Sequence, residues 1–290
     1  MKLCRYDDNR IGVVRNDRVH DVSSIVQSLP SVGYPFPLGD QLVAHLDTLR
    51  PDIERLADKA KPLPVEDVRF LSPVANPTKI IGTPVNYEDH AAEARADAVI
   101  SLAHAEHGGK QRKIEEAGLF LKASSSLVGP SEGVVIRFPE RRTDHEAELG
   151  LVIGRRVSNI SEQEALSAVA GYAIALDMVV RGTEDRSFRK SCDTFSVLGP
   201  WLVTADELGD PGSLSFSLSV NGEPRQNANT RNMIVGVARQ IAWASSMYTL
   251  YPGDIIMTGT PAGVGPVRAG DTMTVTFDRI GSMQVPVRAA

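Results

Sequence analysis

The sequence predicts a β-rich α+β fold, and three observations support this prediction. Short runs of continuous or alternating apolar residues are frequent, as is typical of strands. Only a few segments carry apolar residues at helical spacing. Strand and helix patterns do not alternate regularly, as they would in a fold built from repeated strand–helix–strand units.

The chain is expected to divide into a small N-terminal α/β domain, residues 1–70, and a larger domain, residues 71–290. Prolines occur at positions 62, 64, 73 and 77, close to this boundary. Because proline interrupts helix interiors and central strands, we expect a linker near residues 61–78.

Local patterns place several elements in the first hundred residues. Residues 11–22 predict a hairpin that turns at Asn16-Asp17. Residues 40–60 carry apolar residues at helical spacing, which Pro51 is expected to interrupt. Asn86 is a suitable N-cap for the polar, alanine-rich helix predicted to follow it.

Further elements follow from hydrophobic patterning in the rest of the chain. They are strands at residues 148–154, 172–177 and 272–277, and an amphipathic helix at residues 233–248. Ser161 and Glu164 form a capping box for a short helix between the first two strands. Gly171 stands where the C-cap of that helix is expected.

Composition excludes several classes of protein. Of the 290 residues, 42% are hydrophobic and 23% charged, so the chain is neither disordered nor collagen-like. No apolar run approaches the roughly 18 residues of a membrane helix, and the polar start does not resemble an export signal. A formal charge of −5 argues against nucleic-acid binding. Only Cys4 and Cys192 are present, too few for a disulfide framework, which favours a cytoplasmic protein.

Three acidic residues are the leading candidates for a metal site. Glu146 and Glu148 are two residues apart at the start of a predicted strand, so both point to one face, and Asp177 ends another strand. Three carboxylates suit the hard cations Mg²⁺, Mn²⁺ or Ca²⁺ better than structural Zn²⁺. His145-Glu146 begins like a zinc-protease motif, but Leu149 occupies the position of its second histidine. On spacing alone, a solvent-exposed strand face is the alternative explanation.

A histidine and a glutamate form a candidate catalytic pair. His90 and Glu93 are three residues apart on the predicted helix, so their side chains can meet. A carboxylate raises the basicity of an imidazole and fixes its tautomer, as a general base that activates water requires. A solvated contact on a polar helix is the alternative. His104 and His107 repeat this spacing and are interpreted as surface or lid residues.

Two loops add candidate ligand contacts. Within residues 181–193, the cations Arg181, Arg186, Arg189 and Lys190 suit a carboxylate substrate, and surface ion pairs with Glu184 and Asp185 are the alternative explanation. Residues 258–265 are rich in glycine but lack the spacing of nucleotide-binding motifs. They would either bring Thr260 and main-chain N–H groups to a small ligand or form a tight structural turn.

Taken together, these segments resemble the fumarylacetoacetate hydrolase family over about residues 76–285. The matching segments, in chain order, are Asn86-Tyr87 with His90 and Glu93; residues 119–122; Asp144, Glu146, Glu148 and Leu149; residues 171–177 with Arg181; Lys190 with Asp193-Thr194; residues 198–201; Asn221-Gly222 with Gln226 and Thr230; and residues 252–265. Each segment alone is weak evidence, whereas their number, order and spacing together are specific.

The resemblance implies a mixed β-sandwich roll of the fumarylacetoacetate hydrolase type, usually dimeric, and a role for each matching residue. The implied roles are metal ligands for Glu146, Glu148 and Asp177; the water-activating pair for His90 and Glu93; a catalytic cation for Lys190; and substrate contacts for Arg181, Thr260, Lys122 and Tyr87. The metal is implied to be Mg²⁺ or Mn²⁺, and residues 88–117 are implied to form a lid over the substrate.

The implied reaction is hydrolysis of a carbon–carbon bond in an acylpyruvate, a 2,4-dioxo acid. The metal would act as a Lewis acid that stabilises the departing pyruvate enolate, while His90 takes a proton from the attacking water. The family also includes oxaloacetate decarboxylases, 2-oxo-pentenoate hydratases and isomerases of hydroxymuconate- or 2-oxo-heptenedioate-type dioates, so these activities are alternatives. A catalytically silent metal- or ligand-binding protein is the alternative outside the enzymes.

Four positions differ from the usual pattern of the family, including Ala123, where Pro is frequent, and Val85, where Leu is common. Gly182 follows Arg181 where members often have Asp, and Glu184 stands where many have Gln. A glutamate at position 184 would repel an anionic substrate if it faced the pocket. The resemblance implies two partners, a small oxo-acid substrate and a second copy of the chain. The composition predicts binding to neither nucleic acid nor a membrane.

Overall fold

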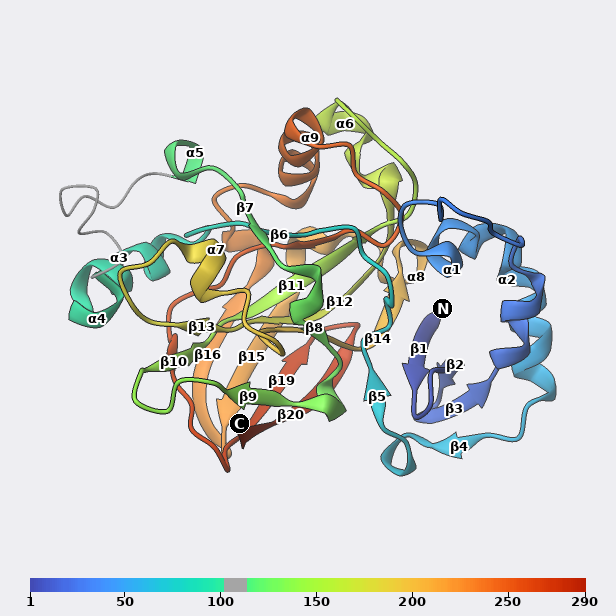
Figure 1. Ribbon diagram of the computed structural model, residues 1–290, viewed down its shortest axis with the longest axis horizontal. Coiled ribbons are helices and arrows are strands. Elements are labelled where there is room, and N and C mark those ends of the chain that lie inside the picture. The colour runs from blue at the N-terminus through green and yellow to red at the C-terminus, as the bar shows by residue number, and fades with distance from the viewer. Residues whose placement is uncertain (102–113) are drawn as a thin grey trace.

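The protein is described by a computed structural model that covers residues 1–101 and 114–290. In this part of the chain, a mixed 12-stranded sheet extends from the N-terminal region across the middle of the molecule (Figure 1). Its strands, in sheet order, are β4 (Leu63–Pro64), β3 (Arg18–Asp21), β2 (Arg10–Arg15), β1 (Lys2–Tyr6), β14 (Ser196–Thr204), β12 (Val169–Asp177), β11 (Ala147–Ile153), β17 (Ile255–Met257), β6 (Ile80–Gly82) and β7 (Phe120–Lys122), with β5 (Phe70–Leu71) beside β1 and β8 (Leu127–Val128) beside β14.

Two smaller sheets pack near the large one in the described residues. The first contains β13 (Val179–Val180), β10 (Thr143–His145) and β18 (Gly265–Pro266), and the second contains β16 (Glu223–Asn229), β15 (Ser215–Val220), β19 (Thr272–Phe277), β20 (Gly281–Ala289) and β9 (Val134–Ile136). The helices are short and peripheral, with α1 (Gln41–Ala44), α2 (Leu46–Lys59), α3 (Glu88–Ala96), α4 (Ala98–Ser101), α5 (Ile114–Ala117), α6 (Glu162–Ala165), α7 (Arg186–Arg189), α8 (Ala205–Leu208) and α9 (Val237–Met247). The architecture confirms the β-rich α+β prediction.

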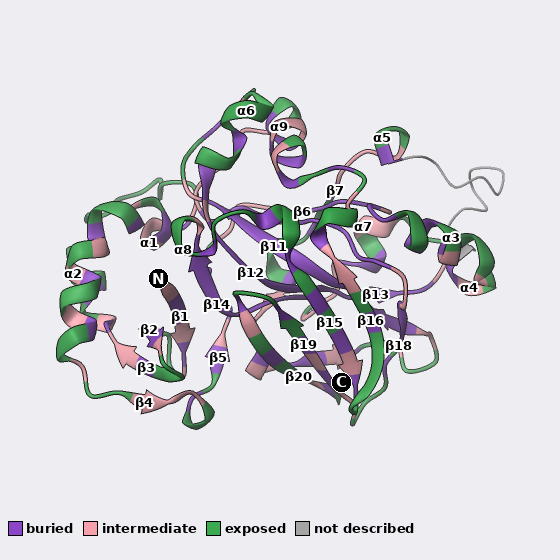
Figure 2. Ribbon diagram, turned by 180° about the vertical axis from the view of Figure 1, so that it is seen from behind, coloured by how far each residue is buried: buried purple, intermediate pink, exposed green. Residues whose placement is uncertain are grey.

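The central strands of the large sheet are buried on both faces. Every residue of β11 is buried, and so is every residue of β12 except Ala170, which is partly exposed (Figure 2). Along β11, Leu149 and Leu151 face the core shared with the five-stranded sheet, whereas Val152 faces the core shared with α2. This two-sided burial explains why both strands are continuous apolar runs in the sequence. It also fixes the register of the acidic residues at the strand ends, because a shift by one residue would exchange the two faces.

The N-terminal region continues the large sheet. Strand β1 pairs with β14 in an antiparallel arrangement, and β5 pairs with the other end of β1. The proline-rich segment predicted to be a linker therefore contains two short strands, β4 and β5. The division into domains at residue 70 stays a prediction.

Several local predictions are confirmed. The hairpin of β2 and β3 turns at Asn16-Asp17, and both residues have positive φ angles (49° and 54°). This is the backbone that two-residue hairpin loops favour, and Asn and Asp tolerate it well. Ser161 caps α6 as expected, since its side chain accepts the N–H of Glu164. Strand β19 buries Met273, Val275 and Phe277 on one face, as the alternating pattern predicted.

Other local predictions are wrong. Helix α2 continues through Pro51, because Leu49 and Ile53 on either side of it are buried in the core, and the helical segment instead breaks at His45. Gly171 is not a helix cap but a residue of β12. A Cβ atom there would lie 2.3 Å from the carbonyl oxygen of Val203, so strand packing requires the glycine.

Asn86 is not the N-cap of α3. Its buried side chain donates to the carbonyl oxygens of Val235 (2.9 Å) and Thr258 (2.8 Å), and it accepts the N–H of Val235 (2.8 Å). The cap position belongs to Tyr87, whose side chain makes no capping bond. Asn86 thus fixes the start of α3 to two distant segments. The predicted helix at 233–248 also begins later, at Val237.

The predicted lid is described only at its two ends, α3 with α4 and α5 (Figure 1). His104 and His107 lie outside the described residues. Among the helices that are described, none is long and apolar enough to cross a membrane.

Asp254 joins two segments that are far apart in the chain. Its fully buried carboxylate accepts the N–H groups of Thr78 (2.9 Å), Lys79 (3.0 Å) and Tyr251 (2.8 Å), and it pairs with the Lys79 ammonium at 2.7 Å. These bonds hold the start of β6 against β17, to which β6 is parallel. Since α3 follows β6, Asp254 also helps to position the pocket described below.

We expect Asp254→Ala to lower the free energy of unfolding by about 3–5 kcal/mol, because it leaves a partly buried lysine and several N–H donors without an acceptor. Urea denaturation followed by tryptophan fluorescence measures the effect. Asp58→Ala is the control, since the ion pair of Asp58 with Arg15 is exposed and its loss should change stability little. Equal stability of the two variants would contradict this role of Asp254.

Candidate active site

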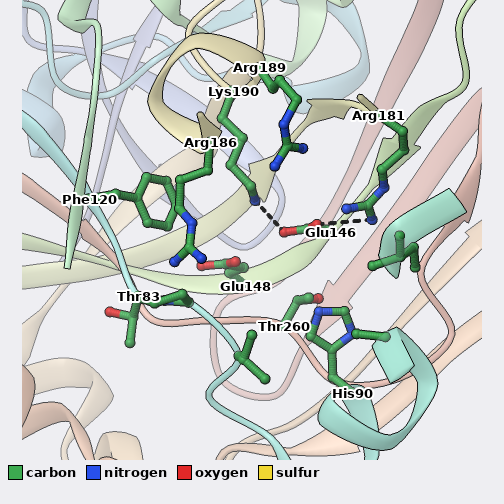
Figure 3. Close-up of a pocket in the computed structure, with 14 residues that line it drawn as sticks. Thr83, His90, Phe120, Glu146, Glu148, Arg181, Arg186, Arg189, Lys190 and Thr260 are labelled. Atoms are coloured by element: carbon green, nitrogen blue, oxygen red, sulfur yellow. Dashed lines mark hydrogen bonds and ion pairs between the residues drawn. The ribbon is translucent and has the colours of Figure 1, made fainter. Parts of the chain in front are cut away.

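A pocket opens where the ends of the central strands meet the start of the lid (Figure 3). Its polar lining includes His90, Glu146, Glu148, Arg181, Arg186, Arg189, Lys190 and Thr260, and its apolar lining includes Val85, Ala94, Ile100 and Phe120. These residues come from α3, α4, β7, β11, α7 and the glycine-rich loop, so the pocket draws on segments from much of the larger predicted domain.

The three predicted metal ligands meet at this pocket. Glu146 lies between β10 and β11, Glu148 is the second residue of β11, and Asp177 ends β12. The Asp177 N–H donates to the Glu146 carbonyl oxygen at 2.9 Å, which sets the two strand ends side by side. One carboxylate oxygen from each of the three residues lies within 4.8 Å of the others, and all three residues are buried.

Two lysines offset part of this negative charge. The Lys190 ammonium lies between Glu146 Oε2 (2.6 Å) and Asp177 Oδ2 (2.5 Å). Lys122 is fully buried behind the cluster, where it pairs with Asp177 and donates to the Phe195 carbonyl oxygen at 2.7 Å. Burial alone would lower the pKa of Lys190, but Asp177 and Glu146 outweigh it and raise that pKa above its ordinary value. Lys190 therefore keeps its charge at neutral pH.

The cluster fits a divalent cation by the chemistry of its donors. Burial opposes the ionisation of Glu146, yet Lys190 and Arg181 lower its pKa to about 2. Burial and the charge of Asp177 instead raise the pKa of Glu148 well above its usual range. A divalent cation would supply the positive charge that Glu148 lacks, and carboxylate oxygens are the donors that Mg²⁺ and Mn²⁺ prefer. Glu146, Glu148 and Asp177 are thus the residues that would hold it.

A chain of ion pairs joins the end of α3, in the predicted lid, to this cluster. Arg142 pairs with Asp97, which follows α3, at 2.9 Å and with Asp144 at 2.7 Å. The other oxygen of Asp144 accepts Arg181 Nε at 2.7 Å, and Arg181 Nη2 lies 3.4 Å from Glu146. Arg181 is therefore held in the pocket wall by two acids.

The His90–Glu93 pair forms as predicted. His90 Nδ1 lies 3.1 Å from Glu93 Oε2, and the other Glu93 oxygen accepts the N–H of Gly263 at 2.9 Å. Burial opposes ionisation of Glu93, but the bonds from His90 and Gly263 outweigh it and lower the pKa of Glu93. An ionised Glu93 favours the tautomer of His90 with its proton on Nδ1, which leaves Nε2 as a proton acceptor.

The glycine-rich loop holds Glu148 of the acidic cluster in place. The Gly259 N–H donates to Glu148 Oε2 at 2.7 Å. Gly259 has a φ angle of +96°, and a Cβ atom there would lie 2.5 Å from the Cβ of Asn86, so no larger residue fits. Thr260 donates to the Ala147 carbonyl oxygen at 2.8 Å and accepts Gln226 Nε2 at 2.8 Å. The hydrogen bonds of Thr260 support the explanation of this loop as a structural turn. Thr260 also lines the pocket, which supports the explanation that the loop contacts a small ligand.

Two predicted substrate contacts lie away from the pocket lining. Tyr87 is 1% exposed and packs edge-on against Phe216 in the core, and its hydroxyl group has no hydrogen-bond partner among residues 1–101 and 114–290. Lys122 reaches the site through Asp177. His145 is also fully buried, and burial lowers its pKa to about 4, so it is neutral at pH 7 and lies outside the metal cluster.

Two of the positions that differ from the family pattern, Gly182 and Glu184, are linked through Arg141 in the structure. Glu184 forms a two-pronged ion pair with Arg141 (3.0 and 2.8 Å) and does not line the pocket. Arg141 also donates to the Arg181 carbonyl oxygen at 2.9 Å. A Cβ atom at Gly182 would lie 2.1 Å from the Arg141 guanidinium, so glycine at 182 accommodates the pair. Glu184 therefore does not repel a bound anion in the pocket.

Sequence reasoning assigned no role in the pocket to three residues that the site uses. Asp144 anchors Arg181, and Asn86 and Gln226 tie the glycine-rich loop to the lid and to β11. Asp144 is two residues before Glu146, so the same spacing argument that joined Glu146 to Glu148 could have included it. For Asn86 and Gln226 the only available indication was their place in the matching segments.

Comparisons with known proteins agree with this geometry. A family model described as fumarylacetoacetate (FAA) hydrolase, C-terminal, matches residues 79–288. A maleylpyruvate hydrolase of Aquipseudomonas alcaligenes is 51% identical over 289 residues, which cover 100% of both chains. A 2,4-didehydro-3-deoxy-L-rhamnonate hydrolase of Sphingomonas sp. (strain SKA58) is 36% identical, with 99% of this chain and 96% of the relative covered. The crystal structure of maleylpyruvate hydrolase from Sphingobium sp. SYK-6 with manganese(II) and pyruvate is 38% identical over 100% of both chains, with a TM-score of 0.82.

We expect Glu148→Gln to weaken Mn²⁺ binding by about 10-fold or more, because the neutral amide removes one of three anionic donors. Isothermal titration of the metal-stripped protein with Mn²⁺ measures the affinity. Glu162→Gln is the matched control, since Glu162 is an exposed residue of α6. Unchanged Mn²⁺ affinity in Glu148→Gln would contradict the ligand assignment.

Proposed function

The chain belongs to the fumarylacetoacetate hydrolase family, and we propose that it hydrolyses maleylpyruvate to maleate and pyruvate. It is a metal-dependent hydrolase of the acylpyruvate type, as the sequence predicted. The choice of maleylpyruvate is supported by 51% identity to a maleylpyruvate hydrolase over the full length of both chains. The single observation in the structure that supports it most is the meeting of the buried acidic cluster with the His90–Glu93 pair at one pocket.

We propose that the metal is held by Glu146, Glu148 and Asp177 and is Mg²⁺ or Mn²⁺ in the cell. When bound, the cation would polarise the 2-oxo-acid end of the substrate and offset the negative charge of the departing pyruvate unit. Lys190 lies beside this cluster with its charge preserved, and Arg181 lies on the other side of Glu146. Both cations are placed to orient the 2-oxo-acid end, and they act more strongly where the lid excludes water.

His90 and Glu93 are proposed to activate the water. Glu93 accepts the proton on Nδ1, so Nε2 is the atom that takes a proton from water as its oxygen attacks the carbonyl carbon at C4. The bond between C3 and C4 then breaks, and its electrons leave with the three-carbon unit as the enolate of pyruvate. Protonation of C3 then gives pyruvate, and the remaining four-carbon fragment leaves as maleate.

Thr260, Lys122 and Tyr87 are proposed to support the substrate in different ways. Thr260 lines the pocket and would contact the substrate directly. Lys122 would act through Asp177, which it holds in place. Tyr87 would contact the substrate only if its buried hydroxyl group became accessible when the lid moves.

We also propose that the protein is a cytoplasmic homodimer. The dimer is supported by the resemblance to the family, and the cytoplasm is supported by Cys4 and Cys192, which are both unbridged. Size-exclusion chromatography with light scattering tests the dimer, and a mass near 31 kDa, that of a single chain, would contradict it.

The proposed activity is tested by proton NMR of the metal-stripped protein with maleylpyruvate, before and after addition of Mn²⁺ or Mg²⁺. We expect metal-dependent release of pyruvate and maleate in equal amounts. Parallel samples contain acetylpyruvate and oxaloacetate. Turnover of oxaloacetate alone, with loss of carbon dioxide, would replace the hydrolase assignment by a decarboxylase.

We expect His90→Gln to reduce kcat for maleylpyruvate by about 10²- to 10⁴-fold, because the general base is lost. Mn²⁺ affinity should not change, since His90 does not contribute to the acidic cluster. Pyruvate release measures turnover, and titration calorimetry measures metal binding. Equal losses of turnover and of Mn²⁺ affinity would show that the substitution perturbs the acidic cluster. They would contradict the role of His90 as a general base that acts separately from the metal site.

A further inference from the structure

The turn between β6 and α3 carries a strained residue at the edge of the pocket. Val85 has a φ angle of 49°. Positive φ is rare in residues other than glycine, and for a β-branched residue it is an outlier. Pro84 and Val85 occupy the two central positions of the turn, and the second of these, when its φ is positive, is usually glycine or asparagine. The chain therefore keeps a branched side chain where glycine would be less strained.

Both ends of this turn are fixed by hydrogen bonds to distant segments. Before the turn, the Thr83 N–H donates to the Met257 carbonyl oxygen at 3.0 Å. After it, the Asn86 carbonyl oxygen accepts the Ile234 N–H at 2.9 Å, in addition to the side-chain bonds of Asn86 described above. Only two residues connect these fixed points. The surrounding structure therefore imposes the strained conformation of Val85, as is necessary for such a conformation to persist.

Val85 is the accessible residue of an otherwise buried segment. Within residues 80–87 every other residue is buried, whereas Val85 is half-buried and lines the pocket. Figure 3 shows Thr83 and His90 on one side of the two glutamates of the acidic cluster and Lys190 on the other side. The segment that joins Thr83 to His90, and that contains Val85, thus borders the part of the pocket opposite Lys190. Strained residues are concentrated at functional sites, so the position of Val85 calls for a functional explanation.

Helix α3 places an apolar wall beside the proposed base. His90 and Ala94 are four residues apart on α3, so their side chains lie on one face, and both line the pocket. Ala94 is held in a small buried cluster with Ile100 and Val264. Ile100 and Val85 also line the pocket. A substrate with its 2-oxo-acid end at the acidic cluster and C4 at His90 therefore directs its next carbon, C5, toward this apolar wall.

We propose that Val85 is a specificity-determining residue whose branched side chain limits the space around C5 of the substrate. The site then accepts acylpyruvates that are unbranched at C5, such as maleylpyruvate with its flat double bond, and excludes those that are branched there. This inference rests on the proposed function, because it takes the 2-oxo-acid end to lie at the acidic cluster and C4 to lie at His90. Glycine at position 85 would relieve the strain but would also open this space, which explains why valine is kept.

The kinetic test compares two substrates that differ at C5. Acetylpyruvate has a methyl group there, whereas in trimethylacetylpyruvate C5 carries three methyl groups. We expect Val85→Ala to raise the ratio of kcat/KM for trimethylacetylpyruvate to that for acetylpyruvate by about 10-fold or more, because one methylene group in a fitted apolar pocket changes discrimination by about 10- to 200-fold. Comparing this ratio with that of wild type cancels the different intrinsic reactivities of the two compounds. Val99→Ala is the matched control, since Val99 is a half-buried valine that does not line the pocket.

A stability measurement tests the strained conformation itself. Val85→Ala and Val85→Gly both remove the apolar contacts of the side chain, but only alanine keeps a Cβ atom at positive φ. We expect the urea midpoint of Val85→Gly to exceed that of Val85→Ala by about 0.3 M or more. Equal midpoints, or a lower midpoint for Val85→Gly, would contradict the imposed strain.

A binding test separates this inference from the proposed function. Calorimetry of the Mn²⁺-loaded protein compares 2-oxopentanoate with 5,5-dimethyl-2-oxohexanoate, which are the two kinetic substrates without the 4-oxo group at which water attacks. We expect wild type to bind 2-oxopentanoate at least about 10-fold more tightly, and Val85→Ala to reduce this preference to about threefold or less.

The outcomes distinguish the two proposals. A substrate ratio that does not change in Val85→Ala, or that changes as much in Val99→Ala, would overturn the role of Val85. A binding preference that depends on Val85, in a protein that hydrolyses neither maleylpyruvate nor acetylpyruvate, would support the role of Val85 and refute the proposed function. Hydrolysis of maleylpyruvate together with a binding preference that survives in Val85→Ala would support the proposed function and refute the role of Val85.

Discussion

Mutual repulsion among three buried carboxylates is the constraint around which this molecule is organised. Glu146, Glu148 and Asp177 place one oxygen each within 4.8 Å, in a region where water cannot screen them. Positive charge has to come from elsewhere, and Lys122 and Lys190 provide it from opposite sides of Asp177. The long apolar strands β11 and β12 make the arrangement possible, because two-sided burial leaves their ends no freedom to move apart. The packing of the core thus holds the three carboxylates close together despite their mutual repulsion.

The glycine-rich loop links the two halves of the proposed site. Gly259 donates to Glu148 in the acidic cluster, and Gly263 donates to Glu93 in the proposed water-activating pair. Both contacts need main-chain N–H groups that approach closely, and both glycines have φ angles above +90°. The loop therefore binds protein carboxylates through its main-chain N–H groups, in the way that other glycine-rich loops bind phosphates. A single short segment sets the distance between the proposed metal and the proposed base.

The sequence predicted what depends on short-range patterns and missed what depends on distant partners. Alternating and continuous apolar runs located β11, β12 and β19, and residue spacing brought Glu146 to Glu148 and His90 to Glu93. Asn86 was misassigned as a helix cap because its real partner, Val235, is 149 positions away in the chain. Gly171 matched the local pattern of a helix C-cap. The structure instead requires glycine there because the main chain of Val203, in the neighbouring strand, leaves no room for a side chain. The anchoring of Arg181 by Asp144 likewise depends on tertiary packing that no local window contains.

The ion pairs that run from Asp97 through Arg142, Asp144 and Arg181 to Glu146 have a consequence for how this site can evolve. Charges alternate along the series, so replacing one member leaves its neighbours with an unmatched charge in a partly or wholly buried position. A change at Arg142 would be tolerated only together with changes at Asp97 and Asp144. In related sequences these positions should therefore vary as a group, and a lid taken from one relative into another should work only when its partners are transferred with it.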